Sequence, residues 1–438
     1  MKRIRKFLMS PMVIVVAALV LRLAYLFVGV LTRRTVPNGH LIMAQETVRI
    51  AIHIAEGRGF SSPLKFDTGP TAWLTPIYPY LFAAVSKIFG IATVHSEVAV
   101  KVLNCIFSAL VCLPLFAIGR RLFGPAVGAA AAWLWIFYYP AFFWPAAWIW
   151  DTSLCALALT LILWATYELD DTDSTAQWAG YGGLWAFGAL VNATVLSVLP
   201  GLFAYAAYRA HKRGAAWLRL TAVAAAVFIA GIAPWVIRNQ IIFHGKVLLR
   251  SNFGLELWLG NNPQVPDTWT WWLHPNDDDQ EGMKFAQMGE LAYMQEKERL
   301  AIDFIKTHPS DVARFEWHRF IQNWTGTDDP IMDVWFKIPL WAKAVLLFNC
   351  LFSIFAWTGL IFARRAQPMR YLPLGAVFFF FPLVYYVTHN TPRYRHPMEP
   401  AMALLVVWAI GYPVRAWKES RTRRQIPGAA MEKALVES

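Results

Sequence analysis

Long apolar runs alternate with shorter polar stretches along most of the 438-residue chain. A helix needs about 20 consecutive apolar residues to cross a bilayer, and the runs that approach this length cover residues 8–31, 98–119, 126–146, 152–168, 218–237, 340–362, 371–387 and 400–415. The stretch 178–208 is long enough for two short helices that separate near Asn192 and Ala193. The pattern therefore predicts an all-α polytopic membrane protein with about ten transmembrane helices.

The polar segments divide this chain into modules. Residues 1–237 form a predicted N-terminal transmembrane module with a first external loop at 32–97, followed by a large external region at 238–338, further transmembrane helices at 339–415 and a basic tail at 416–438. The apolar but short segment 76–90 is predicted to be interfacial or re-entrant. Within the large external region we expect helices over 283–323, with a break at His308-Pro309 because proline disfavours helix in the residue before it.

Composition and charge agree with a membrane protein. The chain is 57% hydrophobic and 16% charged, with a mean hydropathy of +0.40, which excludes an ordinary soluble protein. Its net charge of +12 does not indicate nucleic-acid binding, because the basic residues cluster beside apolar runs. These clusters are residues 2–6, Arg120 and Arg121, Arg209, Lys212 and Arg213, Arg364 and Arg365, and the tail. They predict cytoplasmic termini; the acidic loop of Asp170, Asp171 and Asp173 on the same side gives no support.

The first external loop contains the first candidate chemistry. Residues 41–56 have apolar side chains at helical spacing and a polar stripe that includes Glu46 and His53, which predicts an amphipathic helix at the membrane surface. A carboxylate beside basic groups in a cavity could deprotonate a hydroxyl, although a solvated helix face with an ion pair fits the pattern equally well. The following Gly- and Pro-rich chain should line a cavity, and its candidate contacts are Lys65, Asp67, Trp73 and Tyr78.

Several short motifs follow one another in an order that resembles a known superfamily. They are the Gly-x-Gly-Phe turn at 57–60, Pro-x-Tyr-Pro at 76–79, Trp150-Asp151-Thr152, residues 234–239, 250–254 and 257–263, and Arg393-Tyr394-Arg395-His396-Pro397. The series resembles bacterial members of the GT-C superfamily of membrane glycosyltransferases, in particular the protein-mannosyltransferase-like and aminoarabinose-transferase-like branch.

The resemblance implies a GT-C-like bundle with an amphipathic first external loop and a mixed, mainly helical external segment, in a bacterial inner membrane. It also implies inverting transfer on the external face from a polyprenyl-phosphate sugar to a lipid, glycan or protein acceptor, with Glu46 as the general base. The better-known branch has an Asp-Glu pair where this chain has Gln45-Glu46. Asp67 and Asp151 therefore remain alternative bases. We expect a monomer.

A phosphate leaving group requires positive charge close to the bond that breaks. The basic residues on the external side are candidates because positive charge is not expected there, and they are Lys65, Arg238, Arg250, Arg393, Arg395 and His396. Headgroup anchoring is the alternative for each of them. His53, Trp73, Tyr78 and Asn262 are the predicted pocket residues. Asp151 could instead cap a helix that starts at Thr152.

No metal site or cofactor is predicted, although a divalent metal is not excluded. The acidic run from Asn276 to Asp279 lacks the spacing of a calcium loop and is interpreted as a solvated turn. Two other classes of function remain open. A transporter or flippase of a lipid-linked sugar would also need a basic external cavity, but the chain shows no paired broken helices in matching halves. A non-enzymatic scaffold would explain the external region without a base.

Overall fold

The computed structural model describes residues 7–32, 45–327 and 338–425. The basic N-terminal cluster at 2–6, the predicted helix start at 41–44 and the end of the tail from 426 onward lie outside these ranges. The helices of the bundle are α2 (Pro11–Leu31), α5 (Val94–Leu110), α6 (Cys112–Phe123), α7 (Pro125–Phe137), α8 (Tyr139–Ala147), α9 (Thr152–Glu168), α10 (Thr175–Val191), α11 (Leu199–Lys212), α12 (Trp217–Phe243), α18 (Leu340–Ala366), α19 (Leu372–Phe380), α20 (Leu383–Val387) and α22 (Glu399–Gln425).

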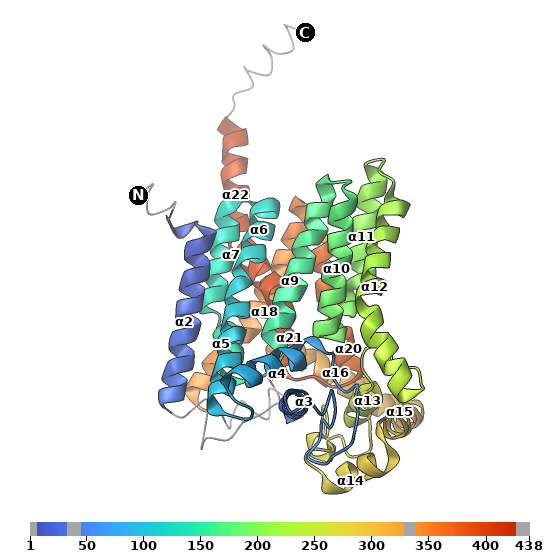
Figure 1. Cartoon of the computed structure of the whole chain (residues 1–438). Helices are drawn as coiled ribbons and strands as arrows, with labels where there is room; N and C mark the ends of the chain where they lie inside the picture. Colours follow the sequence, from blue (N-terminus) through green and yellow to red (C-terminus); the bar gives the residue numbers. More distant parts are fainter. Residues whose placement is uncertain (1–6, 33–44, 328–337, 426–438) are drawn as a thin grey trace.

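The remaining elements gather at one end of this bundle (Figure 1). They are α3 (Gln45–Ala55), α4 (Ile77–Phe89), α13 (Phe253–Gly260), α14 (Asp279–Met288), α15 (Glu290–Thr307), α16 (Pro309–Thr325) and α21 (Pro392–Arg395). Helix α4 lies across the end of the bundle, and α15 and α16 are separated at His308-Pro309 as predicted. The first residues of α2 and the last residues of α22 lie at the opposite end.

The predicted number of ten spans is not confirmed. In the described chain, six helices are long and apolar enough to cross a membrane: Pro11–Leu31, Val94–Phe123, Thr152–Asp171, Trp217–Phe243, Leu340–Ala366 and Pro392–Arg415. The pair α7 and α8, bent by 47°, gives a seventh if it is counted as one broken span. The predicted spans at 178–208 and 371–387 form shorter helices, α10, α11, α19 and α20, which stand in the bundle beside the longer ones (Figure 1).

Close backbone approaches hold pairs of these helices together. A Cβ atom at Gly182 of α10 would lie 2.1 Å from the carbonyl oxygen of Ala224 on α12. At Gly359 of α18, a Cβ atom would lie 2.0 Å from the carbonyl oxygen of Leu405 on α22. Small residues allow such contacts between membrane helices, where dispersion contacts replace the hydrophobic driving force. These two glycines therefore fix the spacing of the helices that carry the external elements.

The acidic loop that did not fit the charge pattern is neutralised within the fold. The buried carboxylate of Asp170 accepts hydrogen bonds from Arg209 Nε at 3.0 Å and from the Tyr205 hydroxyl at 3.1 Å. Arg370 Nε lies 3.4 Å from the same carboxylate. Asp173 accepts a hydrogen bond from Arg213 at 2.8 Å. The acids thus pair with members of the basic clusters, and these ion pairs join the ends of α9 and α11 to the segment before α19.

Candidate active site

Charged side chains from four distant segments converge at the end of the bundle where α3, α4 and α13–α16 gather. They are Glu46 in the first turn of α3, Asp151 just before α9, Arg250 just before α13, and Arg393 in α21. Arg393 interacts electrostatically with both Glu46 and Asp151, and Asp151 interacts with both Arg250 and Arg393. All four belong to the predicted set of catalytic and phosphate-binding residues. The structure thus places two carboxylates around two arginines, in the part of the chain where the loops meet the bundle.

Glu46 is held by side chains of the region 238–338, which is the second loop predicted to be external. Its Oε1 accepts a hydrogen bond from Asn276 Nδ2 at 2.7 Å, and His274 Nε2 lies 3.6 Å from the same oxygen. The side chain of Glu46 keeps 23% of its surface exposed. The interpretation of residues 276–279 as a solvated turn is wrong for Asn276, which is only 7% exposed. It is also incomplete for Asp278, whose carboxylate caps α14 by accepting from the backbone N–H groups of Gln280 and Glu281.

Asp151 does not act as the predicted helix cap. Helix α9 begins at Thr152 as expected, but the Asp151 carboxylate makes no capping hydrogen bond. Its Oδ2 accepts a hydrogen bond from Asn192 Nδ2 at 2.9 Å. Asn192 directly follows the last residue of α10, so the hydrogen-bond donor for this carboxylate stands at the predicted helix break. The carboxylate of Asp151 is therefore oriented toward the charged cluster and not toward the helix backbone.

The two arginines of the cluster retain unused donors. The guanidinium carbon of Arg393 lies 3.7 Å from the ring centroid of Trp150, and its Nη2 donates to the Tyr394 hydroxyl at 3.3 Å. Arg250 Nε donates to the carbonyl oxygen of Trp73 at 3.0 Å. Their other N–H groups have no hydrogen-bond partner among the described residues, and both side chains are half-buried. Held on an aromatic face or a carbonyl, they can donate to an anionic group.

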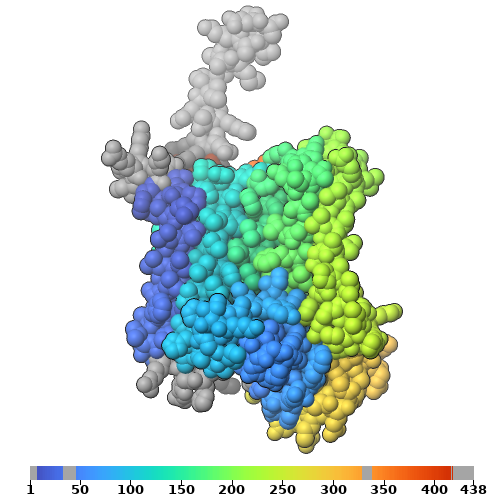
Figure 2. Space-filling model, in the orientation of Figure 1, coloured from blue at the N-terminus to red at the C-terminus, as the bar shows by residue number. Residues whose placement is uncertain are grey.

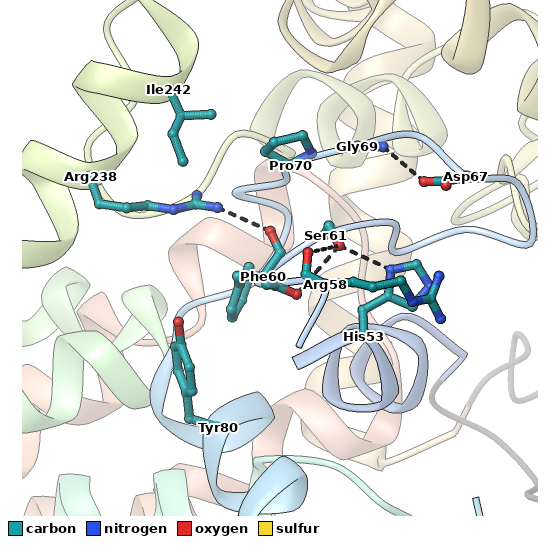
Figure 3. Close-up of a pocket in the computed structure, with 11 residues that line it drawn as sticks. His53, Arg58, Phe60, Ser61, Asp67, Gly69, Pro70, Tyr80, Arg238 and Ile242 are labelled. Atoms are coloured by element: carbon teal, nitrogen blue, oxygen red, sulfur yellow. Dashed lines mark hydrogen bonds between the residues drawn. The ribbon is translucent and has the colours of Figure 1, made fainter. Parts of the chain in front are cut away.

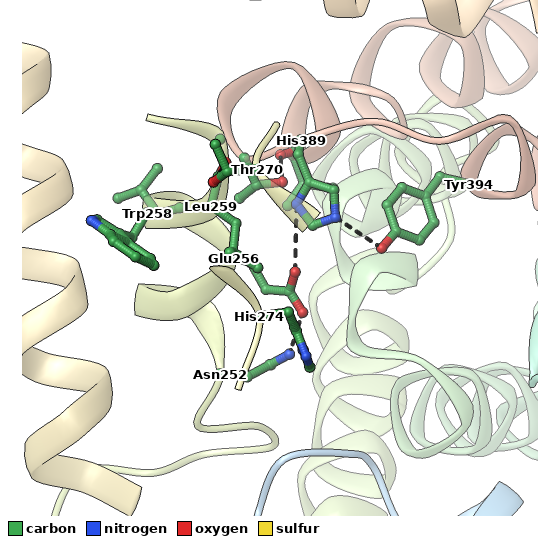
Figure 4. A network of polar contacts seen from close by, with 12 residues as sticks. Asn252, Glu256, Trp258, Leu259, Thr270, His274, His389 and Tyr394 are labelled. Atoms are coloured by element: carbon green, nitrogen blue, oxygen red, sulfur yellow. Dashed lines mark hydrogen bonds and ion pairs between the residues drawn. The ribbon is translucent and has the colours of Figure 1, made fainter. Parts of the chain in front are cut away.

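A network of polar contacts connects α21 to His389 and α13 (Figure 4). The Tyr394 hydroxyl lies 3.2 Å from His389 Nε2, and His389 Nδ1 lies 3.5 Å from Glu256 Oε2. Asn252 Nδ2 donates to Glu256 Oε1 at 2.5 Å, and the ring of Trp269 stacks on the imidazole of His389. Burial lowers the pKa of His389 to about 4, so its imidazole is neutral at neutral pH. The network connects the Arg393 segment to α13.

Arg395 and His396 are not brought to the cluster. Arg395 is 2% exposed; its Nε donates to Glu399 Oε1 at 2.8 Å and its Nη2 to the Tyr138 hydroxyl at 2.9 Å. His396 Nδ1 lies 2.7 Å from Glu399 Oε2. Both groups are bound to the Glu399 carboxylate within the bundle.

Other predicted site residues have structural partners. Lys65 forms an ion pair with Asp279 at the start of α14. Asn262 Nδ2 donates to the carbonyl oxygen of Trp258 and to the Thr270 hydroxyl, both at 2.9 Å. Tyr78 is buried and exchanges hydrogen bonds with Asn104. Of the predicted pocket residues, Trp73 contacts a neighbour of Glu46, because its ring packs edge-on against His274 with the centroids 5.6 Å apart.

Asp67 and His53 line a separate cavity of about 340 Å³. Its walls are the loop at 58–70, Tyr80 of α4, and Arg238 and Ile242 of α12 (Figure 3). The Asp67 carboxylate accepts from the Ser62 hydroxyl at 2.7 Å, and this bond and the Gly69 N–H lower the pKa of Asp67. Burial lowers the pKa of His53, whose Nδ1 lies 3.0 Å from the Ser61 hydroxyl.

Arg238 is part of the wall of this cavity and supports the first external loop. Helix α12 continues to Phe243, beyond the predicted end at 237, so Arg238 lies within its last turns. Its guanidinium donates to the carbonyl oxygens of Thr71 at 2.7 Å and Phe60 at 3.0 Å. On the face seen in Figure 2, the first external loop and the end of α12 lie against each other.

Glu290 joins the two external loops. Its carboxylate accepts from the Thr71 hydroxyl at 2.5 Å, from the Ala72 N–H at 2.7 Å and from the Ser251 hydroxyl at 2.6 Å. Burial raises the pKa of Glu290, and these three donors oppose the rise. The clamp fixes the loop that ends at Trp73 against the segment that carries Arg250. It therefore helps to set the geometry of the charged cluster.

Sequence reasoning missed His274, Asn276, Asn192 and His389. Asn192 carried a usable signal, since it stands at a predicted helix break. His389 also carried one, because it and Asn390 interrupt an apolar run just before Arg393. Nothing in the sequence pairs residues 274 and 276 with residue 46. In the described chain, no group of three or more His, Cys, Asp or Glu residues is arranged to hold a metal ion.

Comparison with known proteins supports the resemblance drawn from the motifs. Residues 73–237 match the family model described as dolichyl-phosphate-mannose-protein mannosyltransferase. No curated protein sequence matches the chain.

Among solved structures, the archaeal oligosaccharyltransferase AglB from Archaeoglobus fulgidus, in complex with an inhibitory peptide and a dolichol-phosphate, matches with a TM-score of 0.55 and 14% identity. The match covers 95% of this chain and 52% of AglB. An oligosaccharyltransferase from Archaeoglobus fulgidus in complex with Zn and sulfate matches with a TM-score of 0.54 and 13% identity, over 97% of this chain and 51% of that one. This chain thus spans about half the length of these structures.

ArnT from Cupriavidus metallidurans, bound to undecaprenyl phosphate, matches with a TM-score of 0.49 and 14% identity, over 95% of this chain and 62% of ArnT. The matches to the oligosaccharyltransferases show a shared fold. The chain has the fold of GT-C membrane glycosyltransferases, and its residues 73–237 carry the sequence pattern of the mannosyltransferase family.

Proposed function

We propose that this chain is a glycosyltransferase that moves a sugar from a polyprenyl-phosphate donor to a hydroxyl-bearing acceptor on the external face of a bacterial inner membrane. The observation that carries the proposal is the convergence of Glu46 and Asp151 around Arg250 and Arg393. The matching family model, named for a dolichyl-phosphate-mannose-dependent transferase, and the dolichol-phosphate in the AglB complex support a lipid-phosphate donor.

The cluster suits a single displacement. Glu46 takes the proton of the acceptor hydroxyl, the acceptor oxygen forms a bond to the anomeric carbon of the sugar, and the bond from that carbon to the phosphate oxygen breaks. The polyprenyl phosphate leaves with the electron pair, and the free N–H groups of Arg250 and Arg393 stabilise its charge. One displacement inverts the configuration at the anomeric carbon. Asp151, held by Asn192, would keep the guanidinium groups of the two arginines in position through its charge.

Replacement of Glu46 tests the proposal. Glu46→Gln keeps the size of the side chain but removes the base, so we expect turnover to fall by at least about a hundredfold. The matched control is Glu56→Gln in the same loop, where the carboxylate is exposed and paired with Arg58. The assay measures transfer of label from radiolabelled undecaprenyl-phosphate sugars to membrane acceptors by purified protein. Near-normal turnover of Glu46→Gln would transfer the role of base to Asp151 or Asp67.

The same assay separates the competing functions. A transporter would move the labelled lipid across a vesicle membrane without transferring its sugar, and a scaffold would do neither. We favour the transferase because the cluster pairs a partly exposed carboxylate with arginines that have unused donors. Transport needs positive charge for the phosphate but no base.

A further inference from the structure

One oxygen of Glu46 receives two groups from the same short turn. Asn276 Nδ2 donates to Glu46 Oε1 at 2.7 Å, and His274 Nε2 lies 3.6 Å from the same atom. The amide oxygen of Asn276 has no hydrogen-bond partner among the described residues. A flipped amide would place this oxygen against the carboxylate, so the bond to Glu46 determines how the amide is oriented.

The protonation of His274 follows from its other ring nitrogen. The backbone N–H of Asn276 donates to His274 Nδ1 at 3.2 Å, so Nδ1 acts as an acceptor. A neutral imidazole with an acceptor at Nδ1 carries its proton on Nε2, which is the nitrogen that faces Glu46. The edge-on ring of Trp73 fixes the plane of the imidazole. Two N–H donors are therefore directed at Oε1.

The turn itself is rigidly built. The carbonyl oxygen of His274 accepts from the backbone N–H groups of Asp277 at 2.8 Å and of Asp278 at 2.9 Å. Asp278 then caps α14, and a Cβ atom at Gly282 in that helix would lie 2.7 Å from the carbonyl oxygen of Pro275. The turn and the first residues of α14 therefore pack as a unit. This packing fixes the positions of the His274 and Asn276 side chains.

We propose that His274 and Asn276 are positioning residues for Glu46. Asn276 donates to Oε1 and His274 stands beside the same atom, which leaves Oε2 to receive the proton of the acceptor. This inference rests on the proposed function in so far as Glu46 is the base. The second external loop thereby completes a site whose base comes from the first.

The hold on Glu46 can be measured without a substrate. A water-soluble carbodiimide with glycine methyl ester modifies carboxyl groups that it can reach, and mass spectrometry of the peptide that contains Glu46 gives the rate of labelling at one pH in the full-length protein. Besides His274, the charged group that faces Glu46 is Arg393, and Arg49 lies one turn along α3. Loss of the Asn276 donor in Asn276→Leu should raise the labelling rate of Glu46 at least about threefold, because Oε1 loses its hydrogen bond.

The exposed neighbour Asp277 supplies the matched control, since Asp277→Asn removes a charge from the same turn without touching Glu46. Its labelling rate should equal that of the unmodified chain. His274→Gln keeps a donor and should change the rate less than His274→Phe. If Asn276→Leu does not fold, Asn276→Ala is measured in its place. An unchanged labelling rate of Glu46 in the Asn276 and His274→Phe variants would overturn the inference.

Transfer activity distinguishes a failure of this inference from a failure of the proposed function. If Glu46 is the base, Asn276→Leu should lower transfer from radiolabelled undecaprenyl-phosphate sugar, and it should have no further effect in a Glu46→Gln background. If Glu46→Gln is active and the labelling of Glu46 in the otherwise unmodified chain responds to Asn276→Leu, the role of Glu46 as base is refuted but the contact is kept. An inactive Glu46→Gln enzyme with additive effects of the two substitutions would refute the positioning role alone.

Discussion

Arg393 and Arg395 stand two residues apart but have different surroundings. Arg393 lies over the ring of Trp150 and keeps donors free, whereas Arg395 is bound to Glu399 inside the bundle. A short helical turn at α21 directs them to different sides. Basic residues in one motif therefore serve two purposes: one can bind an anion, and the other neutralises a buried carboxylate.

Arg393→Ala should weaken binding of undecaprenyl phosphate by about tenfold to a hundredfold, because it removes hydrogen bonds to a charged group. The measurement is the dissociation constant of tritiated undecaprenyl phosphate for the purified protein. Arg364→Ala, at the opposite end of the bundle, is the control and should bind as the unmodified chain does. An unchanged dissociation constant for Arg393→Ala would mean that this arginine only anchors α21.

His389 should make the stability of the protein depend on pH. Its folded pKa of about 4 lies below the ordinary value of 6.5, so its contribution is present above pH 6.5 and is lost as the pH falls toward 4. At pH 5 the loss amounts to about 2 kcal/mol. The charged and polar groups facing it are Glu256, Tyr394, Arg319 and Arg393.

Thermal unfolding of the purified protein at pH 7.5 and pH 5 measures this loss. His389→Gln cannot take up a proton there, so its melting temperature should fall less between the two pH values than that of the unmodified chain. Equal falls in both proteins would assign the acid sensitivity to other groups.

Individual side chains were harder to predict than the presence of charge. The sequence indicated that external arginines and a first-loop carboxylate should meet, and Glu46, Arg250 and Arg393 do so. It could not separate Arg393 from Arg395, since that depends on where a four-residue turn starts. Contacts such as Asn276 to Glu46 join residues 230 positions apart, and no local periodicity encodes them.

At the scale of elements, hydrophobic period and proline position predicted helices well. The start of α9 at Thr152, the break at Asn192 and the break before Pro309 all follow from local chemistry. Helix lengths were less predictable. Helix α12 extends through Arg238 to Phe243 because that arginine binds loop carbonyls and remains compatible with the helix. Tertiary contacts decide such ends, and a single-residue pattern does not contain them.

Helix spacing gives a prediction at this scale. Gly182→Ala should destabilise the protein by about 1–3 kcal/mol, because the added Cβ collides with the carbonyl oxygen of Ala224. The adjacent Gly183→Ala is the control, since nothing lies within 4 Å of its added Cβ. It should be neutral or stabilising by up to about 1 kcal/mol through helix propensity. Melting temperatures in the same detergent check both, and equal values would show that α10 and α12 can separate without cost.

At the scale of the whole molecule, the bundle brings distant segments to one end. Glu46 and Arg393 lie in the short helices α3 and α21, Asp151 and Arg250 stand just before α9 and α13, and α3 and α13–α16 lie together beyond the bundle (Figure 1). The clamp at Glu290 and the turn at His274 then tie the first loop to the second. The site consequently depends on the order in which helices cross the bilayer.

The orientation of the bundle in the membrane can be tested directly. The ends of α6, α11 and α18 carry paired basic residues, which predicts that this end is cytoplasmic and that α16 is external. Single cysteines at the exposed positions Lys212 and Arg314 report the two ends, in a chain whose Cys350 is replaced by serine. A membrane-impermeant maleimide added to intact spheroplasts should label Arg314→Cys at once and Lys212→Cys only after lysis. The reverse order would place Glu46 on the cytoplasmic side and remove the basis for external transfer.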